Sequence, residues 1–438
     1  MTEPSPITRA VRAGIDTDLT HGAVVPPIYL STTYTFAEFG VPRAFDYARR
    51  GNPTRAAAAE AIAGLEGGAG AVVTASGMGA ITAVVSALLK PGDVLVAPHD
   101  CYGGTWRLFD ALAGKGSFEL VLADLTDPQG AAEVIRTRRP TLLWLESPSN
   151  PLLRITDIAT LATEGHAVGA TVVVDNTFCT PLGQRPLALG ADLVVHSATK
   201  YLSGHSDVVA GAIVGSDDEQ VQDLAWWANC LGVTGGAFDS YLLLRGLRTL
   251  HARMAHHESN GAAVIDLLAG HPAVAAVYHP SLPDHPGHQL AATQQQLFGG
   301  IVTFELHGGL DAAKTFMEGL TLFCPAESLG GTESLVSHPG TMTHASMPPE
   351  VQAAAGITPG MIRLSIGIEH VDDLLADLRG ALDRLPLTRG FISSIGTGFD
   401  AQPVVQKPDV TRFFRGRSTS ARSRNIRFAG RSASRRMK

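Results

Sequence analysis

The sequence predicts an α/β protein: a mostly parallel sheet with helices on both faces, followed by a smaller α+β domain. Three observations support this prediction. Short runs of Val, Leu and Ala, typical of strands buried on both faces, recur between residues 71 and 215. Segments with helical periodicity lie between these runs. From Arg253 onward the helical and strand-like segments no longer alternate, which favours an α+β unit.

The chain begins with a loop-rich arm, residues 1–54, which contains many Pro, Gly, Thr and Tyr residues and no sustained helical period. A segment of this length without regular structure is uncommon unless it is functional or packs on something else. Tyr47 and Arg49 are two positions apart, so on an extended segment they point the same way. They either grip a phosphate together or belong to a solvated basic loop, and the spacing leaves both readings open.

The next segment predicts a helix over residues 55–66, a strand over 71–74, and a second helix that ends near Leu89. The small residues Ser76-Gly77-Met78-Gly79 open this second helix. A glycine turn at a helix N-terminus presents N–H groups and the positive end of the helix dipole to an anion. The glycines do not match the GxGxxG spacing of dinucleotide-binding proteins, so a single phosphate fits better.

Further alternation predicts helices over residues 131–138 and 155–168, together with strands over 93–97, 119–123, 141–146 and 171–175. A last strand of this series begins at Val194 and stops at Ser197-Ala198-Thr199-Lys200. Ligands of parallel sheets bind beyond the carboxyl ends of the strands. The polar residues expected there are Tyr102, Asn150, Asp175 and Lys200.

Asp175 and Lys200 suggest a specific chemistry. A lysine amine withdrawn from bulk water loses part of its preference for the charged form and becomes a nucleophile toward carbonyls. An aspartate at the end of a neighbouring strand suits pyridoxal phosphate (PLP), because its carboxylate keeps the pyridine nitrogen protonated. Taken alone, Thr199-Lys200 reads as a surface lysine after a strand, and Asp175 makes the cofactor interpretation the better one.

The second half of the chain predicts a strand over residues 208–215 and a long helical region from Leu224 to Leu250. The second domain has predicted helices over 253–268, 312–319 and 371–385, and predicted strands over 274–278, 301–306, 320–323 and 361–367. Arg363 lies in the middle of an apolar strand, where an unpaired guanidinium is costly, so we expect it to meet an anion. The expected organisation is an arm (1–54), a cofactor domain (55–252), an α+β domain (253–385) and a tail (386–438).

Composition limits the other possibilities. The four cysteines form no CxxC pair and no zinc spacing, which favours reduced thiols in the cytoplasm. We expect no membrane-spanning run and no signal peptide. The tail from Arg389 holds twelve Lys and Arg against two Asp, while the whole chain has a net charge of −7. It reads as disordered and accessory, and nucleic-acid binding through this tail is the alternative from a different class.

Several motifs occur in one order along the chain: Tyr47-x-Arg49-x-Gly51-Asn52-Pro53-Thr54, Ser76-Gly77-Met78, Tyr102-Gly103-Gly104-Thr105, Ser147-Pro148-Ser149-Asn150-Pro151, Asp175-Asn176-Thr177 and Ser197-x-Thr199-Lys200-Tyr201. With them the sequence resembles the Cys/Met-metabolism PLP enzymes from about Ile7 to Arg384. The resemblance implies a fold-type I PLP-dependent transferase and a homotetramer whose active sites are shared between subunits.

The resemblance also implies roles for individual residues. Lys200 would bind the cofactor covalently and move protons, Asp175 would pair with the ring nitrogen, and Tyr102 would stack on the ring. The remaining cofactor contacts would be Gly77, Met78, Ser197 and Thr199 at the phosphate, Asn150 at the ring hydroxyl, and Tyr47 and Arg49 from the neighbouring subunit. The substrate contacts would be Arg363, Glu327, Ser328, Arg107, Asp46 and Asn229, and no metal is expected.

Within this family the motifs look most like those of members that replace the γ-acyl group of an O-acylhomoserine. The expected substrates are O-succinylhomoserine, or another acyl ester, and L-cysteine. Tyr102-Gly103-Gly104-Thr105 and Glu327 argue for chemistry at the γ-carbon, but they do not exclude γ-elimination. A γ-lyase or a direct sulfhydrylase of the same family therefore remains the alternative.

Overall fold

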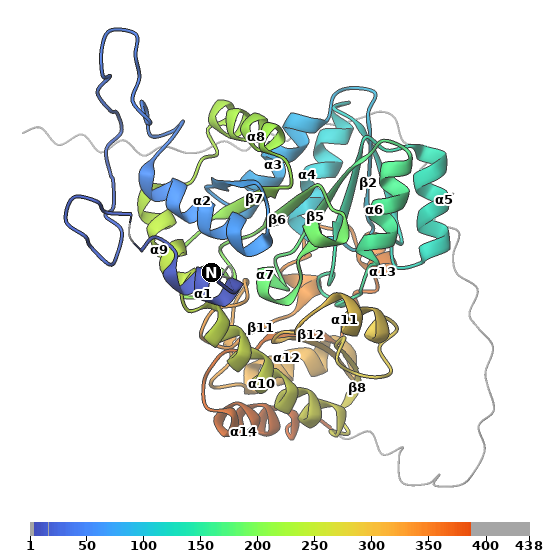
Figure 1. Cartoon of the computed structure of the whole chain (residues 1–438). Helices are drawn as coiled ribbons and strands as arrows, with labels where there is room; N and C mark the ends of the chain where they lie inside the picture. The colour runs from blue at the N-terminus through green and yellow to red at the C-terminus, as the bar shows by residue number, and fades with distance from the viewer. Residues whose placement is uncertain (1–3, 16, 387–438) are drawn as a thin grey trace, which may run out of the picture. The chain divides into compact units, whose positions relative to one another are not determined.

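The computed structural model describes residues 4–15 and 17–386, in which two β-sheets are each covered by helices (Figure 1). The larger sheet has seven strands in the order β1-β7-β6-β5-β4-β2-β3. In that order the strands are β1 (Gly70–Thr74), β7 (Gly211–Gly215), β6 (Leu193–His196), β5 (Thr171–Asp175), β4 (Leu142–Glu146), β2 (Val94–Pro98) and β3 (Glu119–Ala123). Strand β7 is antiparallel to both its neighbours and the other pairs are parallel, so the prediction of a mostly parallel sheet is confirmed.

Alternate residues of the central strands face opposite helical layers. Leu142 and Trp144 of β4 pack in a core with α3 (Gly77–Leu88), α4 (Gly103–Gly114) and α8 (Asp218–Leu231). Leu143 and Leu145 of the same strand pack in a separate core with α5 (Pro128–Arg138) and α6 (Ile158–Ala167). The period of two in a strand thus buries both faces, as the apolar runs predict.

Two further helices lie beside strands β1 and β7, at one end of the larger sheet. Helix α2 (Pro53–Glu66) begins after Asn52, whose side chain accepts hydrogen bonds from the N–H groups of Thr54 and Arg55. It packs against α9 (Ala237–Leu247) in a core that includes Val73 of β1 and Val214 of β7. Short helices α7 (Thr180–Gly183) and η1 (Pro186–Leu189) connect β5 to β6.

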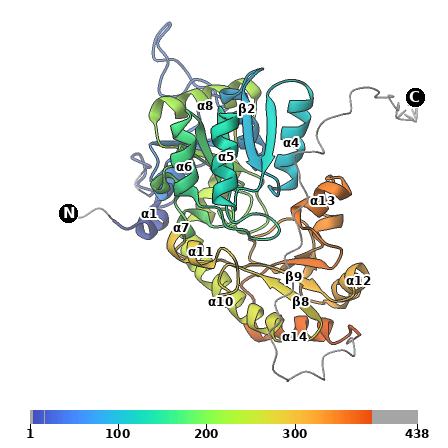
Figure 2. The same cartoon turned by 90° about the vertical axis from the view of Figure 1, so that its right-hand side faces the viewer.

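The smaller sheet has five strands, which are β10 (Cys324–Pro325), β11 (Leu335–Ser337), β12 (Met361–Ser365), β9 (Ile301–Leu306) and β8 (Val274–Tyr278) in sheet order. Helices α10 (Leu250–Ala269), α12 (Gly309–Gly319) and α14 (Val371–Leu382) cover it and share one apolar core with it (Figure 2). The other elements that follow α10 in the chain are α11 (His288–Gln294), η2 (Pro339–Thr341) and α13 (Pro349–Ala355).

Three local predictions are wrong. The arm contains a helix, α1 (Pro6–Arg12), where Ser5 accepts from the N–H of Thr8 and Pro6 occupies the first turn. The helical region after Leu224 is broken, because Gly232 ends α8 in a left-handed conformation at φ 72° before α9 begins. Residues 320–323 form a turn rather than a strand, since Asp377 accepts the N–H groups of Thr321, Leu322 and Phe323.

The domain boundaries stay predictions. Helix α10 crosses the expected boundary at residues 252/253, and the expected tail lies outside the described residues from Leu387 onward. Within residues 4–15 and 17–386, no helix combines the length and the apolar character needed to cross a membrane.

Candidate active site

A cavity of about 360 Å³ opens at the carboxyl ends of the strands in the larger sheet. It collects residues that are far apart in the sequence, as the topology predicts. Eleven of the expected site residues line it: Gly77, Met78, Tyr102, Asn150, Asp175, Ser197, Thr199, Lys200, Glu327, Ser328 and Arg363. Most come from the larger sheet, whereas Glu327, Ser328 and Arg363 come from the segment that forms the smaller sheet.

Lys200 lies in the turn that follows β6, four residues beyond the end of that strand. Its main-chain N–H donates to the carbonyl of Ser197, so the turn is closed by the chain itself. Burial, with the Arg363 guanidinium nearby, lowers the pKa of the Lys200 amine from 10.5 to about 8, while Asp175 and Glu327 oppose this shift. The amine is therefore partly neutral near pH 7, as a nucleophile or a base requires.

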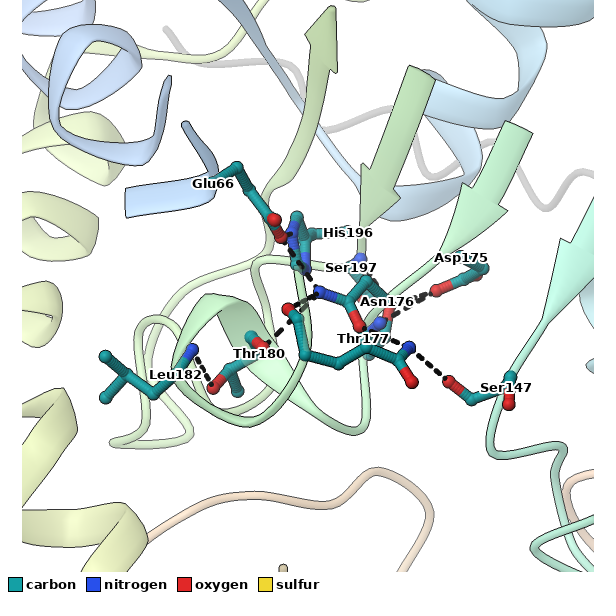
Figure 3. A network of polar contacts seen from close by, with 10 residues as sticks. Glu66, Ser147, Asp175, Asn176, Thr177, Thr180, Leu182, His196 and Ser197 are labelled. Atoms are coloured by element: carbon teal, nitrogen blue, oxygen red, sulfur yellow. Dashed lines mark hydrogen bonds and ion pairs between the residues drawn. The ribbon is translucent and has the colours of Figure 1, made fainter. Parts of the chain in front are cut away.

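Asp175 and Ser197 are joined through a single hydroxyl group. Thr177 Oγ1 donates to Asp175 Oδ1 at 2.6 Å and accepts from the main-chain N–H of Ser197 at 2.8 Å (Figure 3). The main-chain N–H of Thr177 donates to the same carboxylate oxygen at 3.0 Å. Burial raises the pKa of Asp175, and these hydrogen bonds act against that shift. A cation placed at the second oxygen of this carboxylate would be strongly bound.

A fully buried polar network fixes the turns that carry Asp175 and Ser197 (Figure 3). Glu66 Oε1 accepts from His196 Nε2 at 2.7 Å and from Asn176 Nδ2 at 2.9 Å. Asn176 Oδ1 in turn accepts from Gln184 Nε2 at 3.1 Å, and the same Gln184 amide donates to the carbonyl of Ser147. Because His196 precedes Ser197 and Asn176 follows Asp175, the network sets the spacing between these two site residues.

The N-terminus of α3 forms one wall of the cavity. Ser76 caps this helix by accepting the N–H of Gly79 at 3.0 Å. A Cβ atom added to Gly77 would lie 2.8 Å from Ser197 Cβ, so only glycine allows this close approach. The helix dipole and the Ser197 hydroxyl therefore face the same space, which suits a phosphate group.

Arg363 is 2% exposed and lies in β12. Its Nη1 donates to Asn150 Oδ1 at 2.9 Å and its Nη2 donates to the carbonyl of Ser328 at 2.9 Å. Ser328 adopts φ 95°, a conformation that non-glycine residues rarely adopt and that is found at functional sites. No carboxylate of the described residues forms an ion pair with Arg363, so this buried cation is set up to receive an anion.

The other expected site residues lie outside this cavity in the single chain. Arg49 donates to the main-chain carbonyl of Asn229 at 2.8 Å, and its guanidinium lies 5.7 Å from the centre of the Tyr47 ring. Asp46 pairs with Arg50 at 2.8 Å. Arg107 is exposed on α4 one turn after Tyr102, close enough to lower the pKa of that phenol against the effect of burial. The structure therefore does not bring these five residues together with Lys200.

The sequence prediction missed Glu146, Thr177 and Phe178, which also line the cavity. The sequence contains a signal for Thr177, since it belongs to the Asp175-Asn176-Thr177 motif and lies just after the same strand. Glu146 ends β4, as Asp175 ends β5, and the two are paired in the strand register. A carboxylate at the end of a buried strand is the local signal that makes Glu146 a candidate, although it does not say what Glu146 contacts.

The residues present fit PLP. The cavity is in the size range of small-molecule sites, and the N-terminus of α3 at Gly77 matches a phosphate. Lys200 supplies an amine with a lowered pKa. None of the described residues donates a hydrogen bond to Asp175 Oδ2, which leaves this oxygen for a protonated ring nitrogen.

Comparisons with known proteins agree with this geometry. The model of the family described as "Cys/Met metabolism PLP-dependent enzyme" matches residues 7–383. The chain is 57% identical over 371 residues to cystathionine gamma-synthase of Escherichia coli K12, which covers 85% of this chain and 96% of the relative. It is 44% identical over 388 residues to cystathionine gamma-lyase of Dictyostelium discoideum, with 88% and 100% covered.

A solved structure is similar over almost its whole length. Cystathionine gamma synthase from Xanthomonas oryzae pv. oryzae, in complex with aminoacrylate and cysteine, superposes with a TM-score of 0.86 at 57% identity. The match covers 87% of this chain and 99% of that chain. A second structure of the Xanthomonas oryzae pv. oryzae protein, in complex with cystathionine, gives the same values.

Proposed function

Because the chain belongs to the Cys/Met metabolism PLP-dependent enzyme family, we propose that it is a cystathionine γ-synthase of methionine biosynthesis. It would replace the acyl group of O-succinylhomoserine with the sulfur of L-cysteine, giving L-cystathionine and succinate. The observation that carries this proposal is one cavity lined by Lys200, Asp175 and Arg363 in a chain 57% identical to known γ-synthases. The γ-lyase relative is less similar, at 44%.

When bound, PLP supplies an electron sink that stabilises negative charge at the substrate α-carbon. The chain's own groups hold the reactants around that sink. Arg363 would bind the α-carboxylate with its two outer nitrogens, which Asn150 and Ser328 already orient. Asp175 would keep the ring nitrogen protonated, and the Gly77 turn with Ser197 would hold the phosphate.

Lys200 would move the protons. Its amine, with a pKa of about 8, can accept the proton from the α-carbon near neutral pH, and it would give that proton up again before it accepts the one that leaves the β-carbon. Loss of the β-proton lets the γ-succinate leave, and the cysteine thiolate then adds at the γ-carbon. The proton that the thiol gives up balances the charge of the departing succinate. Tyr102 would lie on the ring face.

We also propose that the protein is a cytoplasmic homotetramer. Tyr47 and Arg49 do not line the cavity of their own chain, although the family resemblance implies that both contact the cofactor phosphate. A neighbouring subunit's cavity is where these two residues would act. We likewise propose, rather than observe, that the acyl group of the homoserine ester is succinyl.

The test is to supply O-succinylhomoserine with and without L-cysteine and to identify the products. We expect L-cystathionine and succinate when cysteine is present. 2-Oxobutanoate and ammonia as the main products in both cases would instead identify a γ-lyase.

The Lys200→Ala variant should fold and show no turnover, whereas Lys115→Ala, at an exposed turn, should match the parent. A Lys200→Ala variant as active as the parent would refute the site.

A further inference from the structure

Glu146 is a buried carboxylate to which the sequence and the family resemblance assign no role. It is 5% exposed, ends β4 and lines the cavity. Its two oxygens accept hydrogen bonds from two different segments. Oε2 accepts the main-chain N–H of Tyr102 at 2.9 Å, and Oε1 accepts the main-chain N–H of Asn150 at 3.1 Å.

The two segments that Glu146 joins serve different parts of the site. Tyr102 immediately precedes α4 and is the residue expected to lie on the cofactor ring. Asn150 orients Arg363 through its side-chain oxygen, and its main-chain carbonyl contacts His344 Nε2 at 3.0 Å. One carboxylate therefore connects the ring-facing residue to the clamp for the substrate carboxylate.

An ionised carboxylate suits these two bonds better than any neutral side chain of the same shape. An ionised Glu is an acceptor at both oxygens, so it satisfies both N–H groups at once. A Gln of the same shape would turn an NH₂ donor toward one of them. Hydrogen bonds to a charged acceptor are also about twice as strong as those between neutral groups.

Retaining this carboxylate has an electrostatic cost. Glu146 and Asp175 are register partners on adjacent strands, and burial together with the Asp175 charge raises the pKa of Glu146. The groups that face Glu146 also include Asp100, which is itself paired with Arg154 at 3.1 Å. A cationic ring nitrogen at Asp175 would relieve the repulsion, so ligand binding and the geometry held by Glu146 are linked.

We propose that Glu146 is a positioning residue that holds Tyr102 and the Asn150–Arg363 clamp in one fixed arrangement. The cofactor ring and the substrate carboxylate are then bound by a single rigid unit. The inference rests on the proposed function for the identity of the two ligands. It predicts that damage to Glu146 weakens both binding events together.

The experiment compares the parent with Glu146→Gln in two binding measurements. The first is titration of the apoprotein with PLP, followed by the absorbance of the bound cofactor. The second is titration of the PLP-loaded protein with L-alanine, which has the α-carboxylate but no γ-leaving group. We expect both dissociation constants to rise about tenfold, as expected when one charge-assisted hydrogen bond is lost.

Asp377→Asn is the matched control. Asp377 also accepts main-chain N–H groups from a turn, at Thr321, Leu322 and Phe323, but it does not line the cavity. This variant should lower the melting temperature and leave both dissociation constants unchanged. If Glu146→Gln behaves in the same way, the residue has only a structural role and the proposal is overturned.

A second variant and a double-mutant cycle complete the test. Glu146→Asp keeps the charge but is one methylene too short to reach both N–H groups, so a smaller rise in both constants is expected.

Combining Glu146→Gln with Asn150→Ala should give less than additive weakening of L-alanine binding, because Glu146 acts through Asn150. Full additivity, or failure of both Glu146 variants to fold, would reject the positioning role. PLP and L-alanine binding need no γ-replacement, so failure of the proposed reaction remains a separate result.

Discussion

Arg363 donates a hydrogen bond to Asn150 at 2.9 Å although the two residues are 213 positions apart. Asn150 follows a strand of the larger sheet and Arg363 lies within the smaller one. The candidate site therefore exists only where the two sheets come together. Among the residues that the structure describes, none accepts a hydrogen bond from the buried Arg363 Nε, whereas both outer nitrogens are held in place. The guanidinium is therefore held in position before a substrate carboxylate binds, so a substitution that changes its geometry should weaken substrate binding.

Arg363→Lys should raise KM for the homoserine ester far more than it lowers kcat. A lysine ammonium cannot contact Asn150 Oδ1 and the Ser328 carbonyl in the planar geometry that Arg363 uses. The lysine keeps the positive charge but loses one charge-assisted hydrogen bond to the carboxylate, which costs about 1.5–3 kcal/mol. Steady-state kinetics with the ester as the varied substrate checks this. Arg136→Lys, on the exposed side of α5, is the control, and an unchanged KM in Arg363→Lys would show that the carboxylate binds elsewhere.

The rate of PLP uptake by the apoprotein should rise with pH, with a midpoint near pH 8, and level off above about pH 9. Only the neutral amine attacks an aldehyde, and burial lowers the pKa of Lys200 from 10.5 to about 8. Deprotonation therefore increases across the range from about pH 7 to pH 9. Stopped-flow absorbance measures the rate, and Lys200→Ala should lack this pH-dependent phase. A midpoint near 10.5 in the parent would mean that the amine is solvated.

Gly77→Ala should weaken PLP binding, although alanine is itself a better helix former than glycine. The added Cβ would lie 2.8 Å from Ser197 Cβ and 3.0 Å from Ser197 Cα, so the wall of the phosphate site must shift. Crowding of this kind costs about 1–3 kcal/mol. Gly64→Ala is the matched control, since it lies within α2 with nothing inside 4 Å of the new atom. It should stabilise the fold by up to about 1 kcal/mol. Equal PLP affinity in Gly77→Ala and the parent would place the phosphate elsewhere.

Arg49→Ala should reduce PLP retention, and the defect should be complemented between subunits. If Arg49 reaches the cofactor of a neighbouring chain, co-expression with Lys200→Ala produces mixed oligomers. Some of their sites contain Lys200 from one chain and Arg49 from the other. We expect the mixture to be more active than the sum of the two variants measured separately. If mixing restores nothing while both variants assemble, Arg49 acts within its own chain or not at all.

Much of the architecture follows from the sequence. The strands that end at Asp175 and near Lys200 are buried on both faces, so their periodicity identifies them without tertiary information. The cap at Ser76 and the glycine at position 77 likewise mark a helix N-terminus locally. Such features depend on residues within one turn or one strand. Short-range patterns therefore place Lys200, Asp175 and the phosphate turn at one edge of a sheet.

Tertiary packing decides the rest. Glu146 ends a buried strand as Asp175 does, and only the fold brings its oxygens to the N–H groups of Tyr102 and Asn150. The turn at residues 320–323 reads as a strand until Asp377, more than 50 positions later, accepts its N–H groups. Contacts over such separations depend on how whole elements pack against one another. The propensities of single residues do not predict these contacts. The free energy that stabilises them comes from burial of apolar surface across the whole fold.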